Sequence, residues 1–175
     1  WSKTAVYYLF AGHLAASLLC GILWRGKKRE NADKSFRVKY SSLAESFVTA
    51  VHFSCSKLLE ICGFAVISCV IITLLEEWGI LSFLSSLISR ITGLSLLSSE
   101  AAVCGMIEVT SGCLKASKTG GSYILLLSFI TSLCSVSILS QLRSILKVEK
   151  ISMRPFFMSR PVHAVISCSI SYSLY

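Results

Sequence analysis

The stretch AAVCGMIEVTSGCL, residues 101–114, lies between Glu100 and Lys115 and has a single charged side chain, Glu108, near its middle. As a helix, a stretch of this length rises about 21 Å, which is short of the ~30 Å hydrocarbon core of a bilayer. The segment is therefore apolar but too short for an easy crossing. Because a carboxyl group at membrane depth is costly, Glu108 is a candidate functional residue.

The rest of the chain has the composition of a polytopic membrane protein. Apolar residues make up 54% and charged residues 15% of the sequence, against about 25% charged residues in a soluble domain. The formal charge of +8 comes mostly from two basic segments, residues 25–39 and 143–160, which lie beside apolar runs. Basic residues in such places report membrane orientation. We therefore expect the lipid bilayer as a partner and no nucleic acid.

Three segments have the length of a membrane crossing: residues 5–24, 58–78 and 123–142. Residues 161–175 begin a further apolar segment. The chain starts at Trp1, close to an apolar run and without a recognisable signal peptide. We interpret it as the carboxyl-terminal part of a longer protein.

Two amphipathic segments flank the second span. Residues 41–57 have helical spacing of apolar side chains, and Ser42 with Glu45 has the pattern of a capping box. We expect an interfacial helix here; the alternative is the lower end of one long tilted helix. Residues 79–99 predict a second interfacial helix, on the outer surface. In the second basic segment, the prolines at 155 and 161 are expected to break helices.

The charge pattern decides the path of residues 101–114. By the positive-inside rule both basic segments are cytoplasmic, which requires an even number of crossings between them. Residues 58–78 and 123–142 supply two, so 101–114 must enter and leave on the outer side. We therefore predict a re-entrant hairpin, a structure that is tolerated where protein or a water-filled cavity covers it.

Three motifs resemble one known family. Residues 105–112, GMIEVTSG, look like a G-x-x-E-x-T-x-G segment; residues 135–141 are SVSILSQ; and residues 153–160, MRPFFMSR, look like a basic P-F-F loop before the last helix. In this order they resemble the carboxyl-terminal half of the sporulation integral membrane proteins with a nucleoside-recognition (Gate) domain. The resemblance covers roughly residues 40–175, where this chain departs from the family in having Cys134 and Ser135 where a glycine is usual.

The composition, the apolar spacing and the charge pattern predict an all-α fold, a polytopic membrane helical bundle with interfacial amphipathic helices and a re-entrant hairpin. By the resemblance, residues 1–39 would be a transmembrane helix plus a basic cytoplasmic loop, and residues 40–175 the carboxyl-terminal copy of the nucleoside-recognition domain. This copy would be the transporter-like half of an inverted repeat. The resemblance also implies a multi-pass inner-membrane protein of an endospore-forming bacterium, needed for spore cortex formation.

The first functional hypothesis is a carrier or solute-recognition protein. Glu108 and Thr110 of the hairpin, with Ser137 and Gln141 of the third span, would line a polar substrate-binding site near the midplane. A carboxyl group with no base in its own segment should favour the protonated form, which would suit proton coupling. The alternative role of Glu108 is to cap the tip of the hairpin by accepting hydrogen bonds from backbone amides. The partner under this hypothesis is a small polar solute such as a nucleoside, and a homo-oligomer is a further candidate assembly.

The second hypothesis is a structural or scaffolding membrane protein in spore-envelope assembly, without transport. An enzyme is not expected, because no G-x-S-x-G, H-E-x-x-H or P-loop occurs in the sequence. His13, His52 and His163 sit in separate segments; His13 is read either as a pore-facing contact or as a neutral histidine bonded to a neighbouring helix. The cysteines form no C-x-x-C pair, so we expect neither a metal nor a cofactor.

Overall fold

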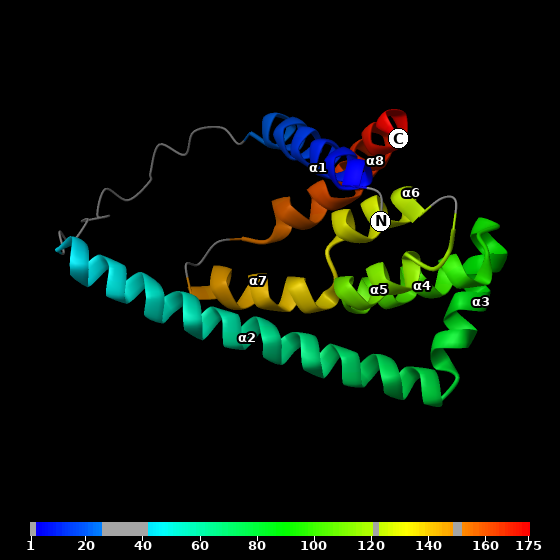
Figure 1. Cartoon of the computed structure of the whole chain (residues 1–175), viewed down its shortest axis with the longest axis horizontal. Helices are drawn as coiled ribbons and strands as arrows, with labels where there is room; N and C mark the ends of the chain where they lie inside the picture. Colours follow the sequence, from blue (N-terminus) through cyan, green and yellow to red (C-terminus); the bar gives the residue numbers. More distant parts are fainter. Residues whose placement is uncertain (1–2, 26–41, 121–122, 149–151) are drawn as a thin grey trace.

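The computed structural model describes residues 3–25, 42–120, 123–148 and 152–175, and these ranges contain helices and no strand. Figure 1 shows α1 and α8 lying together on one side of α6, while α2 runs along the opposite edge of the molecule. The helices are α1 (Lys3–Leu23), α2 (Leu43–Glu77), α3 (Ile80–Thr92), α4 (Leu96–Ile107), α5 (Val109–Ala116), α6 (Tyr123–Leu133), α7 (Val136–Val148) and α8 (Arg154–Leu174). The predicted all-α class is confirmed for the described part of the chain. Of the first basic segment, only Arg25 lies within the described part; residues 26–39 lie outside it.

Several of these helices are long and apolar enough to cross a membrane. Three stretches within the described ranges meet that condition: Thr4–Leu23, Leu43–Glu77 and Tyr123–Ser144. A fourth would be the pair α3 and α4, which bends by 116° between the two helices. Their outer faces carry many exposed large apolar side chains, as expected of surfaces that meet lipid. The prediction of a multi-pass membrane protein is supported at this level.

Helix α2 is one continuous helix over its 35 residues, about 52 Å long. Ser42 caps it, since the Ser42 hydroxyl accepts a hydrogen bond from the Glu45 amide at 3.2 Å. The predicted separate interfacial helix over 41–57 is therefore wrong, and the alternative of one long helix is what the structure has. No glycine or proline interrupts the junction, and the Lys57–Glu60 ion pair (2.5 Å) bridges it.

Helix α3 occupies the first part of the predicted helix 79–99. It ends at Thr92 because Gly93 has a φ of 71°, a left-handed conformation that glycine adopts readily. Ser95 then caps α4 by accepting a hydrogen bond from the Ser98 amide. The single predicted helix is thus two helices that meet at a sharp bend.

Helices α4 and α5 form a helical hairpin where one was predicted, with Glu108 as the one residue between them, and its re-entrant path stays a prediction. They run antiparallel and almost touch: a Cβ on Gly112 would lie 2.2 Å from the Cα of Gly105 and 3.0 Å from the carbonyl oxygen of Ala101. A side chain at residue 112 has no room, so only glycine permits this approach. The hairpin extends beyond 101–114 at both ends, from Leu96 to Ala116.

The third predicted span is interrupted. Helix α6 ends at Leu133 and α7 begins at Val136, and Cys134 between them has a φ of 60°. Ser135 caps α7 by accepting a hydrogen bond from the Ile138 amide at 3.2 Å. The stretch is still long and apolar enough to be the predicted span, but its helix breaks at residues 134 and 135, and a non-glycine residue in the left-handed region is not evident from the sequence.

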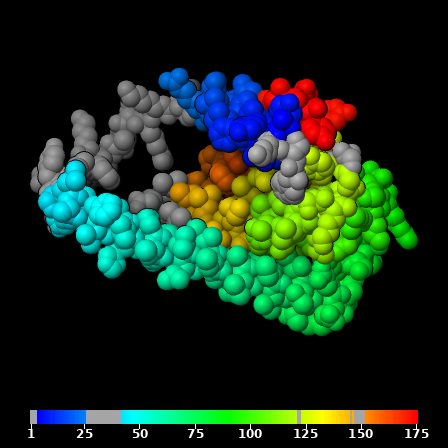
Figure 2. Space-filling view, in the orientation of Figure 1, coloured from blue at the N-terminus to red at the C-terminus, as the bar shows by residue number. Residues whose placement is uncertain are grey.

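Helix α8 contains both prolines that were expected to break helices. It begins at Arg154 with Pro155 in its first turn and continues through Pro161 to Leu174. Pro155 fits there because the first turn has no acceptor for its missing amide hydrogen. Small side chains let α8 pack on α1: a Cβ on Gly12 would lie 2.3 Å from the Ser171 hydroxyl oxygen. Figure 2 shows α1 in contact with the carboxyl-terminal part of α8 on this face.

Candidate functional site

The tip of the hairpin is held by Glu108. This residue is extended (φ −144°, ψ 123°) and is the N-cap of α5. Its two carboxylate oxygens accept hydrogen bonds from the Thr110 amide at 3.0 Å and from the Ser111 amide at 2.7 Å. The side chain is 7% exposed. A carboxylate placed there satisfies amides that have no partner within the helix and lies favourably at the positive end of the helix dipole.

This arrangement matches the capping role that the sequence left open for Glu108. Hydrogen bonds from two backbone amides stabilise the ionised carboxyl group, which acts against the expected protonated form. Among the described residues, the hydrogen bonds of Glu108 stay within the hairpin. The carboxylate still has acceptor capacity, because two oxygens offer about four lone-pair positions.

The other three predicted site residues lie in two places. Thr110 is exposed on α5, directly after the hairpin tip. Ser137 and Gln141 lie one turn apart on α7, and the Gln141 amide nitrogen donates to the Ser137 hydroxyl at 3.4 Å. In the parts of the chain that the structure describes, no hydrogen bond joins this pair to Glu108. Helices α4 and α7 nevertheless contact each other, so the two places belong to neighbouring elements.

The hairpin is docked on α6 beside the interruption of that span. Gly105 faces Ile130, whose Cγ2 atom would lie 2.6 Å from a Cβ at residue 105. Ala101, Ala116 and Leu127 complete the buried cluster between the hairpin and α6. Ile130 lies one helical turn before Cys134, so the hairpin packs next to the non-helical backbone at 134 and 135.

An ion-pair network fixes the open end of the hairpin. The Lys115 ammonium lies 2.5 Å from a Glu100 carboxylate oxygen and 2.7 Å from one of Glu76. Burial alone would lower the pKa of Lys115, but the hydrogen bonds to Glu100 and Glu76 outweigh it and raise that pKa. The network ties α5 to α4 and to the end of α2. No local sequence pattern predicts this network, because the three residues belong to three separate segments.

A second polar cluster joins α1, α6 and α8. The rings of His13 and His163 stack, and the Ser17 hydroxyl lies 3.2 Å from Nε2 of His163. Thr131 contacts His13 from α6 at 2.8 Å. Ser167 lies 3.4 Å from the ring nitrogens of His13. The sequence interpretation of His13 as a histidine bonded to a neighbouring helix agrees with these contacts.

Serines extend this cluster along the α6–α8 contact. The hydroxyls of Ser128 and Ser167 lie 2.6 Å apart, and Ser128 also donates to Ser171 at 3.4 Å. Such small hydroxyl residues allow close helix contact inside a membrane bundle. The pairing of Ser17 with His163 lacks the third group that orients a catalytic base: Nδ1 of His163 is buried without a hydrogen-bond partner in the described structure.

A cavity of about 490 Å³ lies on α7, between this helix and the beginning of α8. Ser140, Arg143 and Phe157 are among its lining residues. None of the four predicted site residues lines it, although Ser140 directly precedes Gln141. The residues that the structure describes contain no cluster of three potential metal ligands, and the described cysteines are free thiols.

Comparison with protein-family models, with curated proteins and with solved structures gave no match to this chain. The class of protein therefore rests on the structure itself. Over its described residues the chain is all-helical, with three to four helical stretches long and apolar enough to span a membrane.

Proposed function

We propose that this chain is part of a membrane carrier or solute-recognition protein of the nucleoside-recognition type that acts in spore cortex formation. In this proposal the α4–α5 hairpin is re-entrant and the chain is one half of an inverted repeat in the inner membrane. The observation that carries the proposal is the contact of Gly105 with Ile130, which places a helical hairpin next to an interrupted helix. Interrupted helices and hairpins at the midplane form the binding sites of many transporters.

The solute would meet polar groups from both interrupted elements. On α7, the Ser137 hydroxyl and the Gln141 amide form one hydrogen-bonding edge. On the hairpin, the Thr110 hydroxyl and the unused acceptor positions of Glu108 form another. A nucleoside-like solute, with hydroxyl donors on its sugar and both donors and acceptors on its base, has the complementary groups.

The second candidate function is a scaffolding membrane protein without transport, and one observation favours it. The hydrogen bonds of Glu108 remain inside its own hairpin, so a structural role alone is enough to explain why this carboxylate is buried. Under this alternative the hairpin would only shape the bundle.

A pair of substitutions at residue 108 separates the two functions. Glu108→Asp keeps a carboxylate, and aspartate is a preferred N-cap. Its side chain is shorter by one methylene group, so the charge lies farther from a bound solute. Glu108→Ala removes the cap and should cost about 1 kcal/mol of stability. We expect Glu108→Asp to remain folded while uptake of labelled nucleosides into proteoliposomes falls at least about tenfold, the effect of losing roughly 1.4 kcal/mol of solute binding.

The uptake assay needs a control that alters a serine outside the proposed site. Ser169→Ala on α8 serves, because the exposed Ser169 hydroxyl bonds only to the Val165 carbonyl of its own helix. Ser137→Ala combined with Gln141→Leu should reduce uptake as Glu108→Asp does, while Ser169→Ala leaves it unchanged. Uptake that is absent from the parent protein, or that is unaffected by all of these changes, would support the scaffolding alternative.

A further inference from the structure

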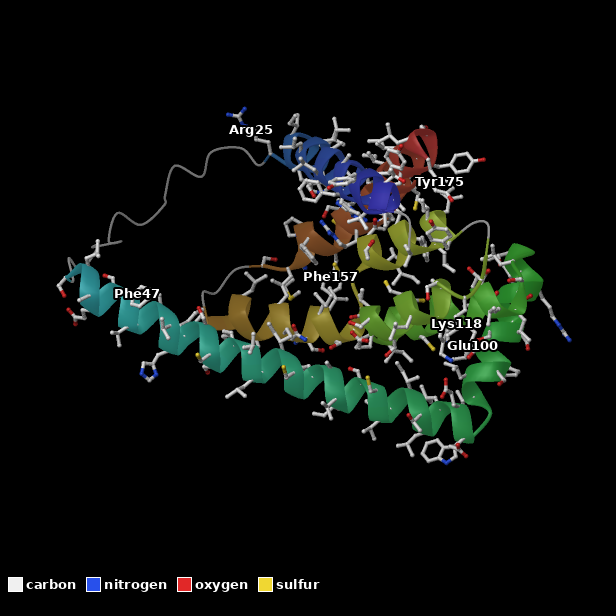
Figure 3. All side chains as sticks on the ribbon, in the orientation of Figure 1. Arg25, Phe47, Glu100, Lys118, Phe157 and Tyr175 are labelled. Atoms are coloured by element: carbon white, nitrogen blue, oxygen red, sulfur yellow. The ribbon has the colours of Figure 1, made fainter. Side chains whose placement is uncertain are left out.

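A pocket of about 290 Å³ lies between the last turns of α1 and the first turns of α8. Its lining includes Ser17 and Gly21 from α1, Trp24 directly after that helix, and Phe156, Ser159 and Arg160 from α8. In Figure 3, Arg25 marks the chain directly after α1, and Phe157 marks the first part of α8 on the side that faces α7. None of its lining residues belongs to the α4–α5 hairpin or to the Ser137–Gln141 pair on α7.

Arg160 brings to this pocket a positive charge that no carboxylate of the described residues pairs. Its guanidinium lies 4.3 Å from the centre of the Phe156 ring, and its hydrogen-bond partners are the Ser159 hydroxyl at 3.5 Å and the Cys134 sulfur at 4.0 Å. The Nε atom of Arg160 is buried without a partner. The ion pairs of the described chain involve Lys57 and Lys115, so no carboxylate there neutralises Arg160.

An unpaired guanidinium at a pocket is chemically unsatisfied. Arginine has five N–H donors and no acceptor, and a partly buried charge without a counter-ion is costly. Neutral partners such as a serine hydroxyl and a cysteine sulfur satisfy few of these donors. An anion that presents two neighbouring acceptor oxygens would satisfy them best, and arginine binds phosphate in this bidentate way.

We propose that this pocket binds a phosphate ester, and that its source is the headgroup of an anionic phospholipid. The pocket lies at the end of α1, where Trp24 follows the helix directly, and tryptophan is enriched at the membrane interface. Seven basic residues follow in the sequence between Arg25 and Lys39, counting both ends. Basic sites of this kind beside membrane helices attract anionic lipids.

The apolar surroundings fit the remainder of a lipid. Trp24, Pro155 and Phe156 give the pocket apolar walls. An acyl chain lying along them would remove apolar surface from water at the interface. A soluble phosphate ester would use Arg160 and the serines in the same way but would gain nothing from this apolar face.

Trp24 provides the probe for the experiment. With Trp1 and Trp78 replaced by phenylalanine, the full chain is placed in nanodiscs containing either brominated phosphatidylglycerol or brominated phosphatidylcholine. Bromine quenches a tryptophan in contact with it. We expect phosphatidylglycerol to bind about tenfold more tightly than phosphatidylcholine, the effect of a hydrogen-bonded charge pair.

Two variants test the pocket by different means. Arg160→Gln removes the charge, and Gly21→Phe fills the pocket without changing charge; a Cβ on Gly21 meets no heavy atom within 4 Å, so helix α1 should tolerate it. Both should abolish the preference for phosphatidylglycerol. Arg90→Gln, an exposed arginine on α3, is the matched charge control and should keep it. Circular dichroism confirms that each variant retains its helices.

A soluble ligand is distinguished in a second arm. Glycerol phosphate is added to the parent protein in nanodiscs of phosphatidylcholine alone, and the emission of Trp24 is followed. A shift that Arg160→Gln removes, without any lipid preference, would keep the phosphate site and overturn the lipid as its source. Equal quenching by both lipids without such a shift would overturn the proposal, as would a preference that survives both Arg160→Gln and Gly21→Phe.

Discussion

The imidazole rings of His13 and His163 stack with centroids 5.4 Å apart and planes inclined by 30°, joining the first helix of the chain to the last. His163 is 3% exposed. Thr131 reaches His13 from α6 at 2.8 Å, so three helices meet at this pair. Such polar contacts inside a membrane bundle orient the helices as well as hold them.

Replacing either histidine should loosen the α1–α8 contact. We expect His13→Ala and His163→Ala each to lower the free energy of unfolding by about 1–3 kcal/mol, because each removes a ring that packs between α1 and α8 and hydrogen bonds to a neighbouring helix. The double variant should lose less than the sum, since one contact is removed in both. Thermal unfolding in detergent micelles measures these changes.

The control for this cycle is His52→Ala, because His52 is exposed on α2 and should leave stability within about 0.5 kcal/mol of the parent. Strictly additive losses at His13 and His163 would mean that the two rings do not support each other.

The second prediction concerns the close approach of the two hairpin helices. Gly112→Ala should destabilise the protein by at least about 1–3 kcal/mol, because its Cβ would lie 2.2 Å from backbone at Gly105 and the helices would have to separate. Gly63→Ala on α2 is the matched control, since a Cβ there meets nothing within 4 Å. Alanine should stabilise that helix by up to about 1 kcal/mol.

Unfolding of both glycine variants can be followed by circular dichroism in the same micelles. A Gly112→Ala protein as stable as Gly63→Ala would show that the hairpin tolerates a wider spacing than the structure has.

The third prediction tests the path of the hairpin in the membrane. In a cysteine-free version of the chain, Ser95→Cys and Ser117→Cys place single thiols just outside the two ends of the α4–α5 hairpin. If the hairpin is re-entrant, an impermeant maleimide labels both thiols from the same side of sealed vesicles. Labelling from opposite sides would make 96–116 part of a crossing and would put one basic segment on the outer side.

Part of this fold could be read from the sequence because it depends on local pattern. The apolar run of α1 and the glycines around Glu108 mark a span and a turn, and the capping role of Glu108 follows from a carboxyl group next to backbone amides at a turn. The end of α3 lies at Gly93, a residue type that often ends helices. These features are encoded by residues close together in the chain.

The rest depends on contacts between distant segments. The helix breaks at Cys134, which has a left-handed backbone conformation although it is not a glycine. Pro161 lies inside a helix that is maintained by packing. The meeting of His13 with His163, and of Lys115 with Glu76, exists only once the helices are assembled. Neither pattern nor spacing along one segment carries that information.

The length of α2 has a consequence for how the protein meets the membrane boundary. A hydrocarbon layer of ~30 Å takes up about 20 residues of an upright helix, so roughly 15 of the 35 residues must extend beyond it or be taken up by tilt. The surplus falls on the polar amino-terminal part, where Glu45, His52 and Lys57 lie. Because no break separates this part from the span, α2 is a rigid rod, and a load applied to its protruding end would be transmitted directly to the bend between α2 and α3.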